Sequence, residues 1–199
     1  TSDHGPGPFD PSGPLRIASC SFLIPRKRVL LLVEALSRMR IPVSWTHFGG
    51  GVEQPLVEEA VARLPENIQV DLRGMTANAE IIAWYQHQPV DVFVHLSSLE
   101  GGVAVAVQEA ASFGIPVVVT DSGGVRDIVD QRTGVLLANE VRPEELARLL
   151  GGFRESEMAT SSFRSGVREA WREGFEANRI FHRFVDQVLL DHAKDRGDR

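Results

Sequence analysis

Short apolar runs alternate with segments of helical periodicity along most of the chain, and this alternation restricts the possible folds most strongly. A parallel sheet accounts for it, because parallel strands are buried on both faces and are joined by helices. We therefore predict an α/β fold: a mostly parallel six-stranded sheet with helices on both faces and right-handed crossovers. The predicted strands cover residues 15–21, 43–48, 68–72, 90–96, 115–120 and 134–138. The predicted helices cover residues 29–36, 56–64, 77–88, 103–113 and 143–150.

Both ends of the chain differ from this alternating middle. Residues 1–14 are rich in glycine and proline and lack periodicity, so we interpret them as a linker or interdomain segment. Toward the C-terminus, apolar residues recur at helical spacing in a charged background. Such a helix either packs on its own sheet or reaches across to a partner domain. Its apolar positions are Trp171, Phe175, Ile180, Phe181, Phe184 and Val188.

Bulk properties exclude several classes of protein. The 199 residues suit one domain with appendages, and the formal net charge of −6 disfavours a nucleic-acid partner. The single cysteine, Cys20, rules out an internal disulfide and lies in an apolar run, which favours a buried strand residue over a nucleophile. The sequence shows neither a transmembrane segment nor a signal-peptide pattern, so we expect a cytoplasmic protein.

The chemistry-bearing residues should lie where the predicted strands end, because ligands of parallel sheets bind beyond the carboxyl ends of the strands. The richest segment there is SSLEGGVAVAVQEA, residues 97–110. Gly101 and Gly102 precede a predicted helix, whose free amides suit a phosphate, although a plain tight turn has the same pattern. Glu109 lies among apolar residues and needs a partner such as a ribose diol, unless it lies on a solvated helix face.

The run SSLEGGVAVAVQEAASFGIPVVVTDSGG, residues 97–124, resembles the signature of retaining glycosyltransferase family 4. That signature has two glutamates, a helix of small residues, a Gly-x-Pro-Val-Val strand and an acidic-x-Gly-Gly turn. The resemblance extends over residues 15–188 through five flanking segments. These are LIPRKRVLLLVEAL, WTHFGGG, VDVFVHLSS, RDIVDQRTGVLL and WREGFEANRIFHRFV.

The resemblance implies a Rossmann-like domain, the C-terminal, donor-binding half of a GT-B fold. Residues 15–173 would bind the nucleotide-sugar, and residues 174–199 would form the C-terminal crossing helix and tail. A missing N-terminal domain would bind the acceptor. No metal or other cofactor is expected, because a lysine and helix amides take the charge of the leaving diphosphate.

The resemblance also implies a role for individual residues. Glu100 matches the first glutamate, which touches the donor sugar and is the catalytic candidate, and Glu109 matches the second, which binds the ribose hydroxyls. Lys27 matches the lysine that faces the diphosphate. The other donor-binding candidates are Gly101, Gly102 and Val103 at the phosphates, and Gly74, Met75 and Thr76 at the base.

The chain departs from the family pattern at three places. Eight residues separate Glu100 from Glu109 instead of seven, so either the loop bulges or the first carboxylate is displaced. Ala104 stands where many members have proline, and Phe22 stands where many have a phosphate-facing arginine. The flanking Arg26 and Arg28 would then assist Lys27, unless they are simply solvated.

Two classes of function fit these residues. In the first, the complete protein transfers a sugar from a UDP- or GDP-linked donor to a hydroxyl acceptor, and this domain alone is inactive. It would be cytoplasmic, or attached peripherally to a membrane through the missing domain. In the second, the chain is a non-catalytic nucleotide-sugar-binding module. A sugar-nucleotide epimerase domain is a related alternative, which the glutamate pair disfavours.

Overall fold

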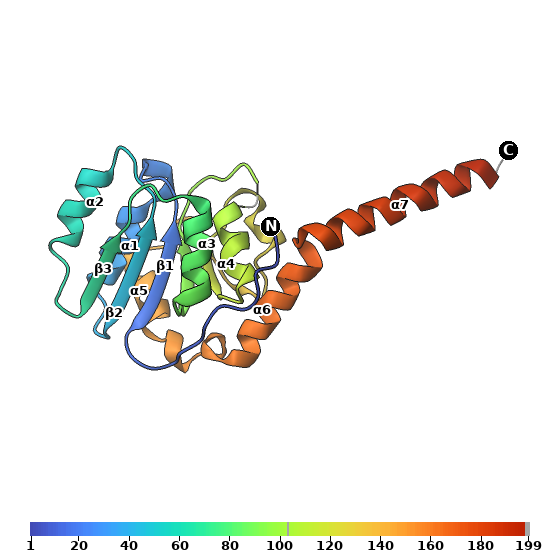
Figure 1. The fold of residues 1–199 in the computed structure, drawn as a ribbon. Helices are drawn as coiled ribbons and strands as arrows, with labels where there is room; N and C mark the ends of the chain where they lie inside the picture. The colour runs from blue at the N-terminus through green and yellow to red at the C-terminus, as the bar shows by residue number, and fades with distance from the viewer. Residues whose placement is uncertain (103, 198–199) are drawn as a thin grey trace.

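A parallel sheet forms the centre of the molecule, as the alternating pattern predicts (Figure 1). The computed structural model describes residues 1–102 and 104–197, with side chains as far as Gln187. The six strands lie in the order β3-β2-β1-β4-β5-β6, and all their pairings are parallel. The predicted fold class is thus confirmed, with the 90–96 segment inside the sheet. The strands are β1 (Leu15–Cys20), β2 (Val43–Phe48), β3 (Ile68–Leu72), β4 (Val92–His95), β5 (Val117–Thr120) and β6 (Gly134–Leu137).

Seven α-helices accompany the sheet in the described part of the chain. They are α1 (Val29–Leu36), α2 (Gln54–Val61), α3 (Asn78–His87), α4 (Val105–Ser112), α5 (Pro143–Gly151), α6 (Ser161–Gly174) and α7 (Ala177–Gly197). Short 3₁₀ turns lie at Pro25–Lys27, Gly123–Asp127, Phe153–Glu155 and Glu157–Ala159.

Two hydrophobic cores lie on opposite faces of the sheet, because successive strand side chains point to opposite sides. In β4, Val92 and Val94 join the core under α1, α2 and α5, whereas Phe93 joins the core under α3, α4 and α6. Every residue of β4 is buried. This explains why its sequence is a continuous apolar run and why the strand could be recognised without alternation.

The helix after the two adjacent glycines begins later than predicted. Ala104 is its N-cap, and α4 starts at Val105 instead of near residue 102 or 103. Gly101 and Gly102 therefore belong to the preceding loop, as expected for residues with poor helix propensity. Glu109 is consequently the fifth residue of α4, just over one turn from its start, and not about two turns in.

The C-terminal apolar pattern is divided between two helices. Phe175 is the C-cap of the first helix, and Glu176 caps the second, because its carboxylate accepts hydrogen bonds from the backbone amides of Asn178 and Arg179 at 3.0 and 2.7 Å. Trp171 of α6 is buried against the sheet. The following helix α7 projects away from the sheet (Figure 1), and Phe181 and Phe184 are 64% and 63% exposed.

Candidate functional site

A cavity of about 210 Å³ lies at the carboxyl ends of the strands. The strand order places β1 and β4 side by side at the centre, and the chain continues outward from them in opposite directions. Ligands of such sheets bind at this point of reversal. The cavity lies beside this point, with walls from the ends of β1 and β2 and the loop before α3, among them Cys20, Phe22, Lys27, Met75 and Thr76. The structure thus brings the predicted lysine and two residues of the predicted base loop to one cavity.

Gly49 fixes the position of the base loop beside the cavity. Its amide donates a 2.8 Å hydrogen bond to the carbonyl of Gly74, which holds residues 74–76 against the end of β2. Gly49 has a φ of +132°, and a Cβ there would lie 1.9 Å from the carbonyl oxygen of Ser21. A side chain at this position would therefore collide with the backbone that forms the opposite wall.

Lys27 ends a 3₁₀ turn whose geometry separates it from its two arginine neighbours. Arg28 adopts the left-handed conformation, with a φ of +50°. Its side chain donates hydrogen bonds to the carbonyls of Leu96, at 2.6 Å from Nε, and of Asn139. Arg26 is exposed. Arg28 therefore holds neighbouring loops together, whereas Lys27 faces the cavity.

The carboxylate of Glu100 points inward and is only 13% exposed. Its Oε1 forms an ion pair with Lys27 Nζ and accepts a 2.7 Å hydrogen bond from His95 Nε2. These contacts, first that of His95 and then that of Lys27, lower the pKa of Glu100 to about 2, against the opposing effect of burial. The structure thus joins two predicted site residues and adds His95, the last residue of β4.

Glu109 is buried within α4, with 8% of its surface exposed, and it does not lie among the residues lining the cavity. Asn78, the first residue of α3, donates a 2.7 Å hydrogen bond from Nδ2 to Glu109 Oε1. Burial raises the pKa of Glu109, while the bond from Asn78 opposes that shift. Burial, followed by the charge of Glu109, raises the pKa of the cavity residue Cys20 to about 11. Glu109 therefore acts electrostatically on a wall of the cavity.

The predicted phosphate loop extends between Glu100 and α4. Gly101 and Gly102 are exposed, and a Cβ on either would have no atom within 4 Å. Val103 lies outside the described residues. Because α4 begins at Val105, the free amides of its first turn belong to residues that follow Gly101 and Gly102 in the chain.

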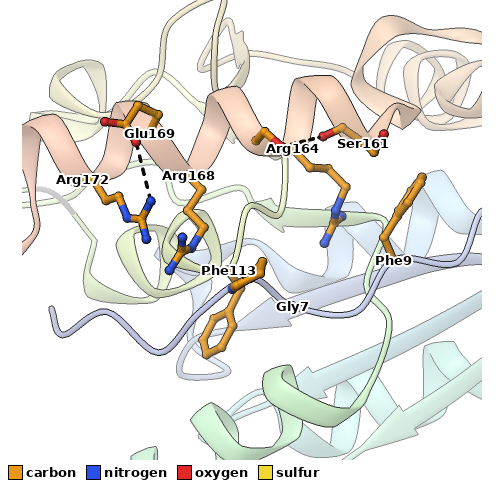
Figure 2. A pocket seen from close by; sticks show the side chains of 10 residues that line it. Gly7, Phe9, Phe113, Ser161, Arg164, Arg168, Glu169 and Arg172 are labelled. Carbon is orange, nitrogen blue, oxygen red and sulfur yellow. Dashed lines mark hydrogen bonds and ion pairs between the residues drawn. The ribbon is translucent and has the colours of Figure 1, made fainter.

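A second hollow, of about 520 Å³, lies between residues 6–9 and α6 (Figure 2). Arg164, Arg168 and Arg172 point from α6 toward it. Arg168 and Arg172 form ion pairs with Asp3, and Arg164 donates to the carbonyl of Val90 at 2.7 Å, with Phe9 against its guanidinium. Because Val90 precedes β4, this hollow is at the opposite end of the sheet from the cavity. Its arginines fasten residues 1–14 to α6, and the interdomain role of that segment stays a prediction.

Two residues of the site, Asn78 and His95, were not identified as functional from the sequence. The local sequence signal for Asn78 is that a polar residue opens the helix that follows the base loop. The described residues contain no group of three or more histidine, cysteine, aspartate or glutamate side chains that could hold a metal ion. No helix among them is long and apolar enough to cross a bilayer.

A parallel doubly wound sheet with a cavity at the carboxyl ends of its strands, beside its point of reversal, is typical of nucleotide-binding α/β domains. Residues 14–152 match the family model of the glycosyl transferases group 1. The chain therefore belongs to this family of enzymes, and the fold is that of one half of a GT-B glycosyltransferase.

Two curated relatives are named as glycosyltransferases. The chain is 27% identical over 143 residues to the amylovoran biosynthesis glycosyltransferase AmsK of Erwinia amylovora, covering 69% of the chain and 35% of AmsK. It is 25% identical over 185 residues to the putative colanic acid biosynthesis glycosyltransferase WcaL of Escherichia coli K12, covering 90% of the chain and 44% of WcaL. The chain thus spans less than half of either relative.

Solved structures share the fold at low sequence identity. Anabaena Alr3699/HepE in complex with UDP superposes with a TM-score of 0.72 and 22% identity, over 88% of this chain and 49% of that protein. The apo form of the lipopolysaccharide outer core galactosyltransferase WaaB superposes with a TM-score of 0.76 and 19% identity, over 94% and 52%. The chain corresponds to about half of each.

Proposed function

We propose that this chain is the donor-binding domain of a retaining glycosyltransferase that transfers a sugar from a UDP- or GDP-linked donor to a hydroxyl acceptor. The observation that carries the proposal is the position of Lys27. It lines the cavity beside the reversal point of the sheet, and it contacts the carboxylate of Glu100, which follows β4 and is matched to the sugar-binding glutamate. The UDP bound to the Anabaena relative supports a nucleoside diphosphate as ligand.

Each part of the cavity suits one part of such a donor. The walls formed by Phe22, Phe48 and Met75 are apolar and offer a surface for the flat base. Lys27 would face the diphosphate and stabilise its charge as the sugar leaves, which is where a fixed cation lowers the barrier most. Glu100 would contact the sugar and Glu109 the ribose hydroxyls, as the resemblance implies. Neither residue lines the cavity in this structure, so both contacts would require a rearrangement when the donor binds.

The remaining parts of the reaction belong to the complete protein. The chain spans less than half of its curated relatives, so we assign acceptor binding to a further domain. No metal is assigned to the diphosphate in this proposal, since Lys27 and backbone amides supply the positive charge. The exposed Phe181 and Phe184 on α7 are candidates for contact with that domain.

A thermal-shift screen of UDP, GDP, ADP and their common sugars tests the proposal directly, because a ligand of the folded state raises the melting temperature. At least one nucleoside diphosphate should stabilise the chain. Lys27→Ala should remove most of that shift. The matched control Arg26→Ala, which deletes an exposed cation from the same turn, should remove less. The proposed function would be rejected if the melting temperature stayed unchanged with every one of these nucleotides.

A further inference from the structure

One carboxylate oxygen at the candidate site accepts hydrogen bonds from two side chains. Lys27 Nζ and His95 Nε2 both donate to Glu100 Oε1, and all three side chains are largely buried. Lys27 comes from the turn before α1, His95 from the end of β4 and Glu100 from the loop after it. The charge of Lys27 is therefore already paired within the protein.

A diphosphate in the cavity would compete for the same ammonium group. Lys27 lines the cavity, whereas Glu100 and His95 do not. Drawing Lys27 toward a phosphate would leave the Glu100 carboxylate in a buried setting, where an unpaired charge is costly. His95, which is 4% exposed at the end of β4, contacts the same carboxylate oxygen at 2.7 Å from a different element than Lys27.

We propose that Glu100 competes with the donor diphosphate for Lys27, and that His95 is the positioning residue that retains the Glu100 carboxylate when Lys27 is drawn away. The inference rests on the proposed function and deepens it. Under this proposal, diphosphate binding separates Lys27 from the Glu100 carboxylate, which stays in contact with His95. His95 then has a role that acts through Glu100 and not through contact with the ligand.

The test uses calorimetric titration of the chain with the nucleoside diphosphate that gives the largest thermal shift, and with its parent nucleoside. Glu100→Gln removes the competing charge at constant size, so diphosphate affinity should rise about fivefold while nucleoside affinity stays unchanged. The matched control Asp121→Asn removes a negative charge from the neighbouring loop, where Asp121 pairs with Arg126. It should change diphosphate affinity by less than about twofold.

A double-mutant cycle isolates the role of His95. His95→Phe should weaken diphosphate binding about threefold, because Glu100 then depends on Lys27 alone. The same substitution in the Glu100→Gln background should have no effect, and His95→Gln, which keeps a donor near Nε2, should restore affinity. If His95→Phe does not fold, His95→Asn replaces it, since its amide is too short to reach the carboxylate.

The outcomes separate this inference from the proposed function. Wild-type chain that binds no nucleotide rejects the proposed function. The competition is rejected if the wild-type chain binds the diphosphate but Glu100→Gln does not raise its affinity. It is also rejected if Glu100→Gln raises the affinity for the nucleoside by the same factor. A loss from His95→Phe that persists in the Glu100→Gln background shows that His95 supports only the fold, and overturns its positioning role.

Discussion

Asn78 Nδ2 donates a 2.7 Å hydrogen bond to Glu109 Oε1, and this contact ties the first residue of α3 to the buried side of α4. Among the hydrogen bonds of the described residues, Asn78 is the donor to this carboxylate, and an ionised carboxylate accepts up to about four. The proposed ribose contact would use the remaining acceptor capacity of Glu109. A ribose diol supplies two hydroxyl donors.

Replacing Glu109 tests this role. Glu109→Ala should weaken binding of the preferred nucleotide by about 1.5–3 kcal/mol, the value of hydrogen bonds to a charged group. Calorimetry gives the affinity, and the exposed Glu80 of α3 provides the control substitution Glu80→Ala. Equal affinities for wild type and Glu109→Ala would remove Glu109 from the site.

The acid stability of the fold should depend on Glu100. Its folded pKa is lowered to about 2 from an ordinary value of 4.5, so its ion pair and hydrogen bond stabilise the fold above pH about 4.5. That contribution is lost as the pH falls toward 2. Urea unfolding should show wild type more stable than Glu100→Gln at pH 7, with the difference shrinking between pH 5 and 3. A constant difference over that range would contradict the assigned pKa.

Gly123 should be the glycine on which the position of Glu100 depends. It has a φ of +59°, and a Cβ there would lie 2.0 Å from the carbonyl oxygen of Glu100. Gly123→Ala should lower the free energy of unfolding by about 1–3 kcal/mol through backbone strain and collision. Gly102→Ala is the matched control, because its Cβ would meet nothing within 4 Å, and it should change stability by no more than about 0.5 kcal/mol. Similar losses for both variants would refute the argument.

The sequence was sufficient for the fold because buried parallel strands are continuous apolar runs. The strand ends also indicated the edge of the sheet at which Lys27, Met75 and Thr76 line one cavity, while their roles toward a donor stay predictions. The partners His95 and Asn78 were missed, because a hydrogen bond between side chains on different elements leaves no periodic signal. The apolar spacing by itself does not mark the break between α6 and α7, because it continues through Phe175, whereas the carboxylate of Glu176 caps the second helix.

The chain alone should bind nucleotide weakly and transfer no sugar. The proposed acceptor domain would cover the cavity, and without that cover water would weaken the charge interactions of a bound donor. Incubation with nucleotide-sugars and hydroxyl acceptors, followed by mass spectrometry of the products, measures transfer. Slow hydrolysis of the donor is compatible with this expectation, whereas efficient transfer to any acceptor would show that the catalytic groups are complete within residues 1–199.

The extra residue beside Glu100 provides a last prediction. The Glu100 carboxylate faces Lys27 and His95 instead of solvent. If the loop bulges to recover the family position, the carboxylate should reach a donor sugar hydroxyl, which stays a prediction. Gly101 is exposed and has no neighbours within 4 Å of a Cβ, so its backbone is the natural place for that bulge. Deleting Gly101 restores the seven-residue spacing. It should leave the affinity for nucleoside diphosphate within about twofold of wild type, since removing an exposed bulged residue need not move the residues on either side. A collapse of affinity, measured by calorimetry on a variant with unchanged melting temperature, would show that the additional residue is itself part of the phosphate site.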